Sequence, residues 1–179
     1  MSIWGKIIGG AAGFALGGPL GALLGTVAGH AVDKMRARPA TDDQRQMAFS
    51  VAVIVLAAKM AKADGVVTRD EIDTFKRIFR VAPHEAANVG RLFDQAKSDV
   101  AGYQPYARQV AGLFADSPWV LEELLDGLFL IAKADGVVHP AELEFLRNVA
   151  HIFGFEAATF ERIFASQATH RDASPYEVL

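Results

Sequence analysis

Residues 62–67 read KADGVV, and the same six letters return at residues 133–138, 71 positions further along the chain. At the same offset Glu71 matches Glu142, and Arg91 matches Arg162. An apolar run precedes each copy, and apolar residues at helical spacing follow it. Asp-Gly between two such segments ends one helix and lets the chain turn before the next. We therefore predict two halves, each with a long apolar helix, a turn, an amphipathic helix and a third helix, and expect the two apolar helices to share one core.

Capping signals set the helix boundaries in these halves. Residues 41–44 and 68–71 each fit a capping box, and Ser117-Pro118 reads as an N-cap followed by the first helical residue. The predicted helices cover residues 43–63, 69–80, 84–97, 106–114, 119–134, 140–153 and 157–167. In the second of these, the apolar residues that fall on one face and are expected to point inward are Ile72, Phe75, Ile78 and Phe79. No alternating pattern indicates a strand, so the predicted fold class is all-α.

A second stretch, residues 7–32, reads IIGGAAGFALGGPLGALLGTVAGHAV and carries no formal charge. As a helix it spans roughly 37 Å, enough to cross a hydrocarbon core of about 30 Å. Its glycines weaken a helix in water, but in lipid only a helix satisfies every backbone amide within one segment. Small residues four apart also let two membrane helices approach closely. The sequence thus predicts a transmembrane anchor within residues 1–36 that forms a homodimer through a glycine stripe: Gly9, Gly13, Gly17, Gly21, Gly25 and Gly29.

Two other interpretations of this stretch stay open, a cleaved signal peptide and a soluble segment that folds against another protein. If the stretch spans a membrane, the flanking charges orient it. Lys6 alone precedes the span, whereas Lys34, Arg36 and Arg38 follow it. The positive-inside rule then leaves the N-terminus outside and the chain after Asp33 in the cytoplasm, with a single pass through the membrane. The absence of cysteine agrees with a reducing compartment.

Composition and motifs narrow the function. A net charge of −3 argues against non-specific binding of nucleic acid. The serines lie in caps and in the tail, with no adjacent base, so we predict no catalytic residue and no enzymatic activity. His139 stands where Thr68 stands in the first half, which favours an N-cap role over metal ligation.

Each repeated turn carries two carboxylates seven residues apart: Asp64 with Glu71, and Asp135 with Glu142. Oxygen ligands near helix N-termini could hold a divalent metal ion, although the spacing excludes an EF-hand. A structural role competes with this hypothesis. The aspartates can accept backbone N–H groups in the turns, and the glutamates stand where a capping box needs its acid.

The repeated ADGVV turn followed by a glutamate, inside paired helical halves, resembles the TerB-like domain of tellurite-resistance proteins, here over residues 43–168. That resemblance implies an all-helical fold and a proposed metal site, which maps onto Asp64, Glu71, Asp135 and Glu142. Residues 174–179, SPYEVL, resemble the usual opening of a J domain. The order of glycine-rich span, TerB-like domain and J-domain start resembles the DjlA family of membrane-anchored DnaJ-like co-chaperones. In that family the anchor dimerises in membrane lipid, and a J domain stimulates the ATPase of the Hsp70 partner DnaK.

From this resemblance we expect an anchor at 1–36, a linker at 37–42, the TerB-like domain at 43–168, and a linker with the start of a J domain cut short at 169–179. No His-Pro-Asp triplet of a J domain occurs in the sequence. The expected function is the anchoring and regulatory region of a DnaK co-chaperone. The alternative is a membrane-tethered TerB-like module that binds metal or responds to stress of the tellurite-resistance type.

Overall fold

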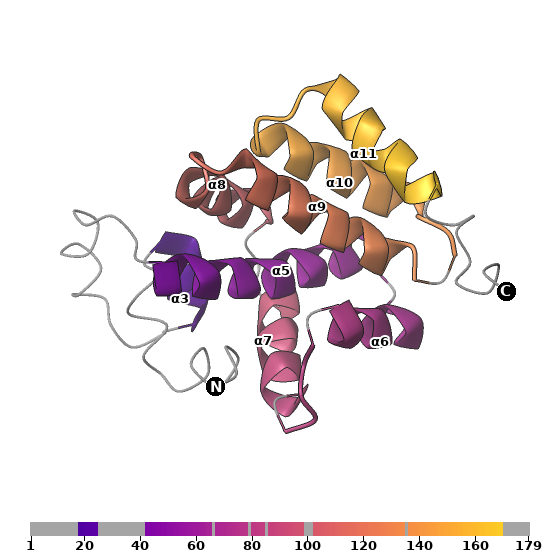
Figure 1. The fold of residues 1–179 in the computed structure, drawn as a ribbon. Helices are drawn as coiled ribbons and strands as arrows, with labels where there is room; N and C mark the ends of the chain where they lie inside the picture. The colour runs from indigo at the N-terminus through magenta and orange to yellow at the C-terminus, as the bar shows by residue number, and fades with distance from the viewer. Residues whose placement is uncertain are drawn as a thin grey trace, which may run out of the picture.

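The computed structural model describes residues 18–24, 42–65, 67–78, 80–84, 86–98, 102–134 and 136–169. Every regular element in these ranges is a helix, which confirms the predicted all-α class for this part of the chain (Figure 1). The seven predicted helices are present, with boundaries within two residues of those expected. The helices are α3 (Gly18–Leu24), α5 (Asp42–Asp64), α6 (Arg69–Ile78), α7 (Ala86–Ser98), α8 (Gln104–Leu113), α9 (Pro118–Ala132), α10 (Pro140–Ile152) and α11 (Ala157–Thr169).

Helix α5 forms the centre of the core. Between Val51 and Ala58 no residue is more than 3% exposed, as expected of a helix that is apolar on every side. It contacts α7, α8, α9 and α10, so neighbours cover its whole circumference. In Figure 1 it crosses the middle of the molecule, with α8 to α11 above it and α6 and α7 below.

The two halves pack by exchanging helices. The first half comprises α5, α6 and α7, the second comprises α9, α10 and α11, and α8 connects them. The apolar helices α5 and α9 contact each other, which confirms the expected shared core. The amphipathic helix of each half lies against the apolar helix of the other, α6 against α9 and α10 against α5, and α10 also contacts α9 of its own half.

Left-handed residues end the helices at the turns. Gly65 (φ 83°), Gly136 (φ 96°) and Gly154 (φ 87°) adopt the conformation that glycine takes most readily. At the end of α6 the same position is held by Arg80, with φ 49°. Its N–H donates to the carbonyl of Arg77, and the N–H of Val81 donates to that of Lys76, the pair of bonds that defines a Schellman motif. Helix α6 therefore stops at Ile78 rather than at the predicted Arg80.

The structure contradicts one prediction about which residues of α6 are buried. Ile72 was expected to point inward, but its side chain is 42% exposed, while Phe75 is buried as predicted. The buried strip of α6 consists of Glu71, Thr74 and Phe75. Helix α6 contacts α9, and with Glu71 in its buried strip the neighbouring Ile72 lies at the edge of that strip, partly exposed.

Helix α3 is the one described element from the glycine-rich stretch. It packs on α8, where the N–H of Leu20 donates to Gln109 Oε1 at 2.7 Å and the Leu20 side chain is fully buried. None of the helices in the described ranges is long and apolar enough to cross a membrane. Of the six stripe glycines, Gly21 alone lies in the described residues, where it is buried. Residues 1–17, 25–41 and 170–179, with the remaining anchor, the linker and the tail, lie outside them.

Candidate functional site

The first repeated turn is closed by the predicted capping box. The N–H of Thr68 donates to Glu71 Oε2 at 3.0 Å, and the N–H of Glu71 donates to Thr68 Oγ1 at 3.2 Å. Two helix-end donors are thereby satisfied reciprocally. The Glu71 side chain is 5% exposed, because α6 presses it toward α9.

The second turn has the same hydrogen bond from the backbone N–H of its N-cap residue to a glutamate. His139 is the N-cap of α10, as predicted, and its N–H donates to Glu142 Oε2 at 3.0 Å. Glu142 is 1% exposed. The structural role considered for the two glutamates is therefore present: each accepts a backbone N–H at the start of its helix.

The described residues do not test the predicted four-carboxylate metal site. Asp135 and the side chain of Asp64 lie outside the described residues. Within the described ranges, no three acidic or histidine side chains come close enough together to hold a metal ion. What the structure does bring together is Glu71 and Glu142, which line one cavity although they are 71 positions apart.

This cavity has a volume of about 310 Å³ and lies among α5, α6 and α7, with single residues from α9 and α10. Most of its wall is apolar, and its rim carries exposed charged side chains from α6 and α7. The residues that line it are Ala57, Met60, Ala61, Val67, Glu71, Ile72, Phe75, Lys76, Val81, Ala86, Val89, Gly90, Phe93, Asp94, Lys97, Ile131 and Glu142. Ligand pockets typically combine such an apolar wall with a few polar groups, and this one is at the small end of their range.

Sequence reasoning missed the cavity and its rim. Periodicity identifies inward-facing residues on each helix, but it does not show that small residues from three helices leave a common space. A signal was nevertheless present in the repeat. At the offset of 71 residues, Ala57 corresponds to Leu128 and Val89 to Phe160, so the first half is smaller at both positions.

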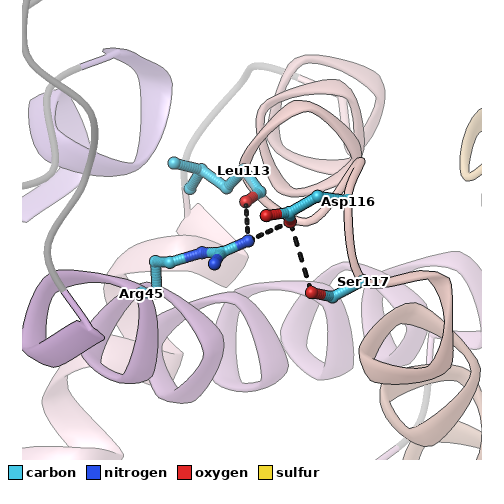
Figure 2. A network of polar contacts seen from close by, with 4 residues as sticks. All are labelled: Arg45, Leu113, Asp116 and Ser117. Atoms are coloured by element: carbon cyan, nitrogen blue, oxygen red, sulfur yellow. Dashed lines mark hydrogen bonds and ion pairs between the residues drawn. The ribbon is translucent and has the colours of Figure 1, made fainter.

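A polar network holds the other end of α5 to the turn between α8 and α9 (Figure 2). Arg45 donates to the Leu113 carbonyl at 3.0 Å and forms an ion pair with Asp116, to which the Ser117 hydroxyl also donates. The Arg45 guanidinium stands 5.4 Å from the centre of the Phe114 ring. The hydrogen bond from Arg45 lowers the pKa of Asp116, although this carboxyl is largely exposed. We interpret the network as a structural clamp.

The second half contains an acid, Asp126, whose pKa is raised rather than lowered. Burial raises the pKa of Asp126 on α9, against the opposing effect of a hydrogen bond from Gln167 Nε2 at 3.0 Å. Gln167 lies on α11 and is itself buried, so this contact ties the last helix to α9. Arg162, also on α11, pairs with Glu122 of α9 at 3.0 Å.

The described part of the chain is thus an all-helical domain of two halves in mutual contact, with an apolar cavity beneath the first repeated turn. The family model for tellurite resistance protein TerB matches residues 50–165. A second model, for the co-chaperone DjlA transmembrane domain, matches residues 1–39. No solved structure matches the chain.

Curated relatives extend this comparison. The co-chaperone protein DjlA of Photobacterium profundum is 32% identical over 186 residues, covering 94% of this chain and 67% of that protein. DjlA of Escherichia coli K12 is 29% identical over 170 residues, covering 90% and 63%, and that of Aliivibrio fischeri is 30% identical over 175 residues, covering 90% and 62%. The chain therefore belongs to the DjlA co-chaperone family and carries its TerB domain. It spans about two thirds of the length of these relatives.

Proposed function

We propose that this chain is the membrane-anchoring and regulatory region of a DjlA-type co-chaperone. The order of the two family matches carries the proposal: a DjlA transmembrane domain over residues 1–39, then a TerB domain over residues 50–165, in a chain whose relatives are co-chaperones. Residues 1–36 serve as the anchor, 37–42 as a linker, 43–168 as the TerB domain, and 169–179 lead into a J domain. The partner is the Hsp70 DnaK, reached through that J domain, and we assign no catalytic step to this chain.

The co-chaperone assignment is tested by reconstitution. The protein with its J domain attached is placed in lipid vesicles, and the ATPase rate of DnaK is measured with and without it. We expect stimulation, and a J domain carried by an unrelated anchor serves as the control for the regulatory role. An ATPase rate that the full protein leaves unchanged contradicts the co-chaperone function. Equal stimulation by both proteins, with the same response to client protein, contradicts only the regulatory part.

The anchor is proposed to cross the bacterial inner membrane once, with its N-terminus in the periplasm and the TerB domain in the cytoplasm. Residues 18–24 cannot at the same time cross a membrane and pack on α8 as helix α3, because they cannot face lipid while Leu20 is buried against α8. The chain has no cysteine, so single cysteines can report on this choice. In membranes, Ala22→Cys should resist a water-soluble maleimide, whereas Ala87→Cys, exposed on α7, should react. Equal reaction of both variants contradicts the span.

Self-association through the glycine stripe is the second part of the anchor proposal. Replacing Gly13 and Gly17 with leucine blocks the close approach of two helices and should weaken pairing in a membrane dimerisation assay. Ala11→Leu with Ala15→Leu is a control off the stripe, with a gain in side-chain volume that is smaller by one methyl group per site. Pairing that survives the glycine variants, or that falls equally in the control, refutes the glycine contact.

A cation site at the two turns is the second candidate function. It is supported by Glu71 and Glu142, which line the same cavity from two repeated turns. The test is calorimetric titration of Ca²⁺, Mg²⁺ and Zn²⁺ into the full chain, with Asp64→Asn and Asp135→Asn as variants. Tight binding that both variants abolish supports a metal-binding module. Binding that is absent, or unchanged in the variants, refutes it.

A further inference from the structure

The second half shows what fills the place that is empty in the first. At the offset of 71 residues, Val89 on α7 corresponds to Phe160 on α11, and Ala58 on α5 corresponds to Phe129 on α9. Phe160 is 4% exposed, and its ring centre lies 5.5 Å from that of Phe129. Two aromatic rings thus pack together in the second half, at positions where the first half has a valine that lines the cavity and an alanine that does not.

An ion pair lies beside these rings in the second half. The guanidinium of Arg147 on α10 stands 5.6 Å from the centre of the Phe160 ring, and its Nη2 lies 3.4 Å from Glu161 Oε1. Phe160 supplies apolar volume, and Glu161, the next residue along α11, supplies the carboxylate that faces the cation. The second half therefore places an apolar group and the acid that follows it next to one arginine.

The first half retains the cation but has no aromatic ring and no acid at the equivalent positions, although Asp94, further along α7, also lies on the rim. Lys76 on α6 corresponds to Arg147, and Gly90 on α7 corresponds to Glu161. A Cβ atom placed on Gly90 meets no atom within 4 Å, so a side chain has room to begin at this position. Lys76 and Lys97 stand exposed on the rim from two different helices. Among the described residues no acidic side chain forms an ion pair with Lys76.

We propose that the cavity binds a fatty acid, a single aliphatic chain with a free carboxylate. The chain occupies the space that Phe160 fills in the second half, and the carboxylate takes the place of Glu161, next to Lys76 and Lys97. The buried glutamates fix this orientation, because two carboxylates beside the cavity disfavour an anion at its inner end. A volume of about 310 Å³ suits one short chain and not the two chains of a phospholipid. This site is independent of the co-chaperone function.

The test uses a decanoic acid analogue with a diazirine on its chain, added to the full chain in lipid nanodiscs. After irradiation the labelled peptides are mapped by mass spectrometry. We expect labelling on cavity peptides from α5, α6 and α7, competed by decanoate. Val89→Phe combined with Gly90→Glu copies the second half into the first and should reduce labelling more than tenfold. Gly90→Glu alone, which has room for its side chain, should also reduce it and keeps the test valid if the double variant unfolds.

Separate experiments test whether binding requires the positive charge of Lys76 and the carboxylate of the ligand. Lys76→Gln should weaken competition by decanoate about two- to fivefold, the range of one exposed ion pair. Arg77→Gln, its neighbour on α6 that does not line the cavity, should leave competition unchanged. Labelling that persists in both Gly90→Glu and the double variant overturns the site. An uncharged decanol analogue that labels the cavity as strongly as the acid overturns the assignment of the ligand class.

Discussion

Arg80 offers the sharpest test of how the first half is built. It occupies the left-handed position that closes the Schellman motif after α6, at φ 49°, where α10 has Gly154. A non-glycine residue in this conformation costs about 1–2 kcal/mol, and glycine costs about 0.4–1 kcal/mol through the freedom it adds to the unfolded chain. Arg80 is exposed, so its replacement removes no buried contact. Arg80→Gly should therefore raise the free energy of unfolding by about 0.5–1 kcal/mol.

The measurement is thermal unfolding of the full chain in a mild detergent, followed by far-ultraviolet circular dichroism. For a chain of this length the expected rise in Tm is about 1–4 °C. Arg80→Ala is the matched control: it removes the same charge but keeps a Cβ in the left-handed conformation, so it should change stability by less than about 0.5 kcal/mol. A lower Tm for Arg80→Gly, or the same shift in both variants, refutes the reasoning.

Three further predictions follow from the second half. Phe160→Val should open a cavity there and lower the free energy of unfolding by about 2–3 kcal/mol in urea titrations, whereas Val89→Ala, at a wall that already faces empty space, should cost less. Glu142→Ala should destabilise by about 1–2 kcal/mol by removing the acceptor of the His139 N–H, and Glu142→Gln, which keeps an acceptor, should cost less in the same assay. Asp126 has a raised pKa in the folded state, so its contribution is full below the unfolded-state pKa and is lost as pH rises through the folded-state value. Asp126→Asn should then stabilise the protein near neutral pH, by less than about 1 kcal/mol, and should remove this dependence from melts recorded between acidic and neutral pH.

Local chemistry explains why the helix boundaries could be predicted. The Asp-Gly turns, the capping box at Thr68 and the Ser117-Pro118 start each act within a few residues, and the helices begin and end where these signals stand. The end of α6 was missed because a left-handed arginine has no signature in the sequence. The exposure of Ile72 was missed for a different reason: its helix packs against α9 of the other half, a contact that helical spacing does not reveal.

The candidate site also has a part that the sequence predicted and a part that it did not. The sequence indicated Glu71 and Glu142 and their capping role, because the pattern is local and repeated. Their place on one cavity depends on the exchange of α6 and α10 between the halves, and the cavity itself depends on small side chains from α5 and α7. Such a space is a property of the assembled helices. In hindsight, aligning the two halves residue by residue locates it, since Val89 and Gly90 stand opposite Phe160 and Glu161.

The exchange of α6 and α10 has a consequence for how such a domain could have originated. The first half, made as a separate polypeptide, leaves its apolar helix α5 without the cover that α10 of the opposite repeat provides, whereas α9 contacts α6 and also α10 of its own half. Two copies of the half would supply each other's cover. An ancestor that resembled the first half is therefore expected to have been more stable as a pair than alone, and gene fusion would have left each member free to diverge.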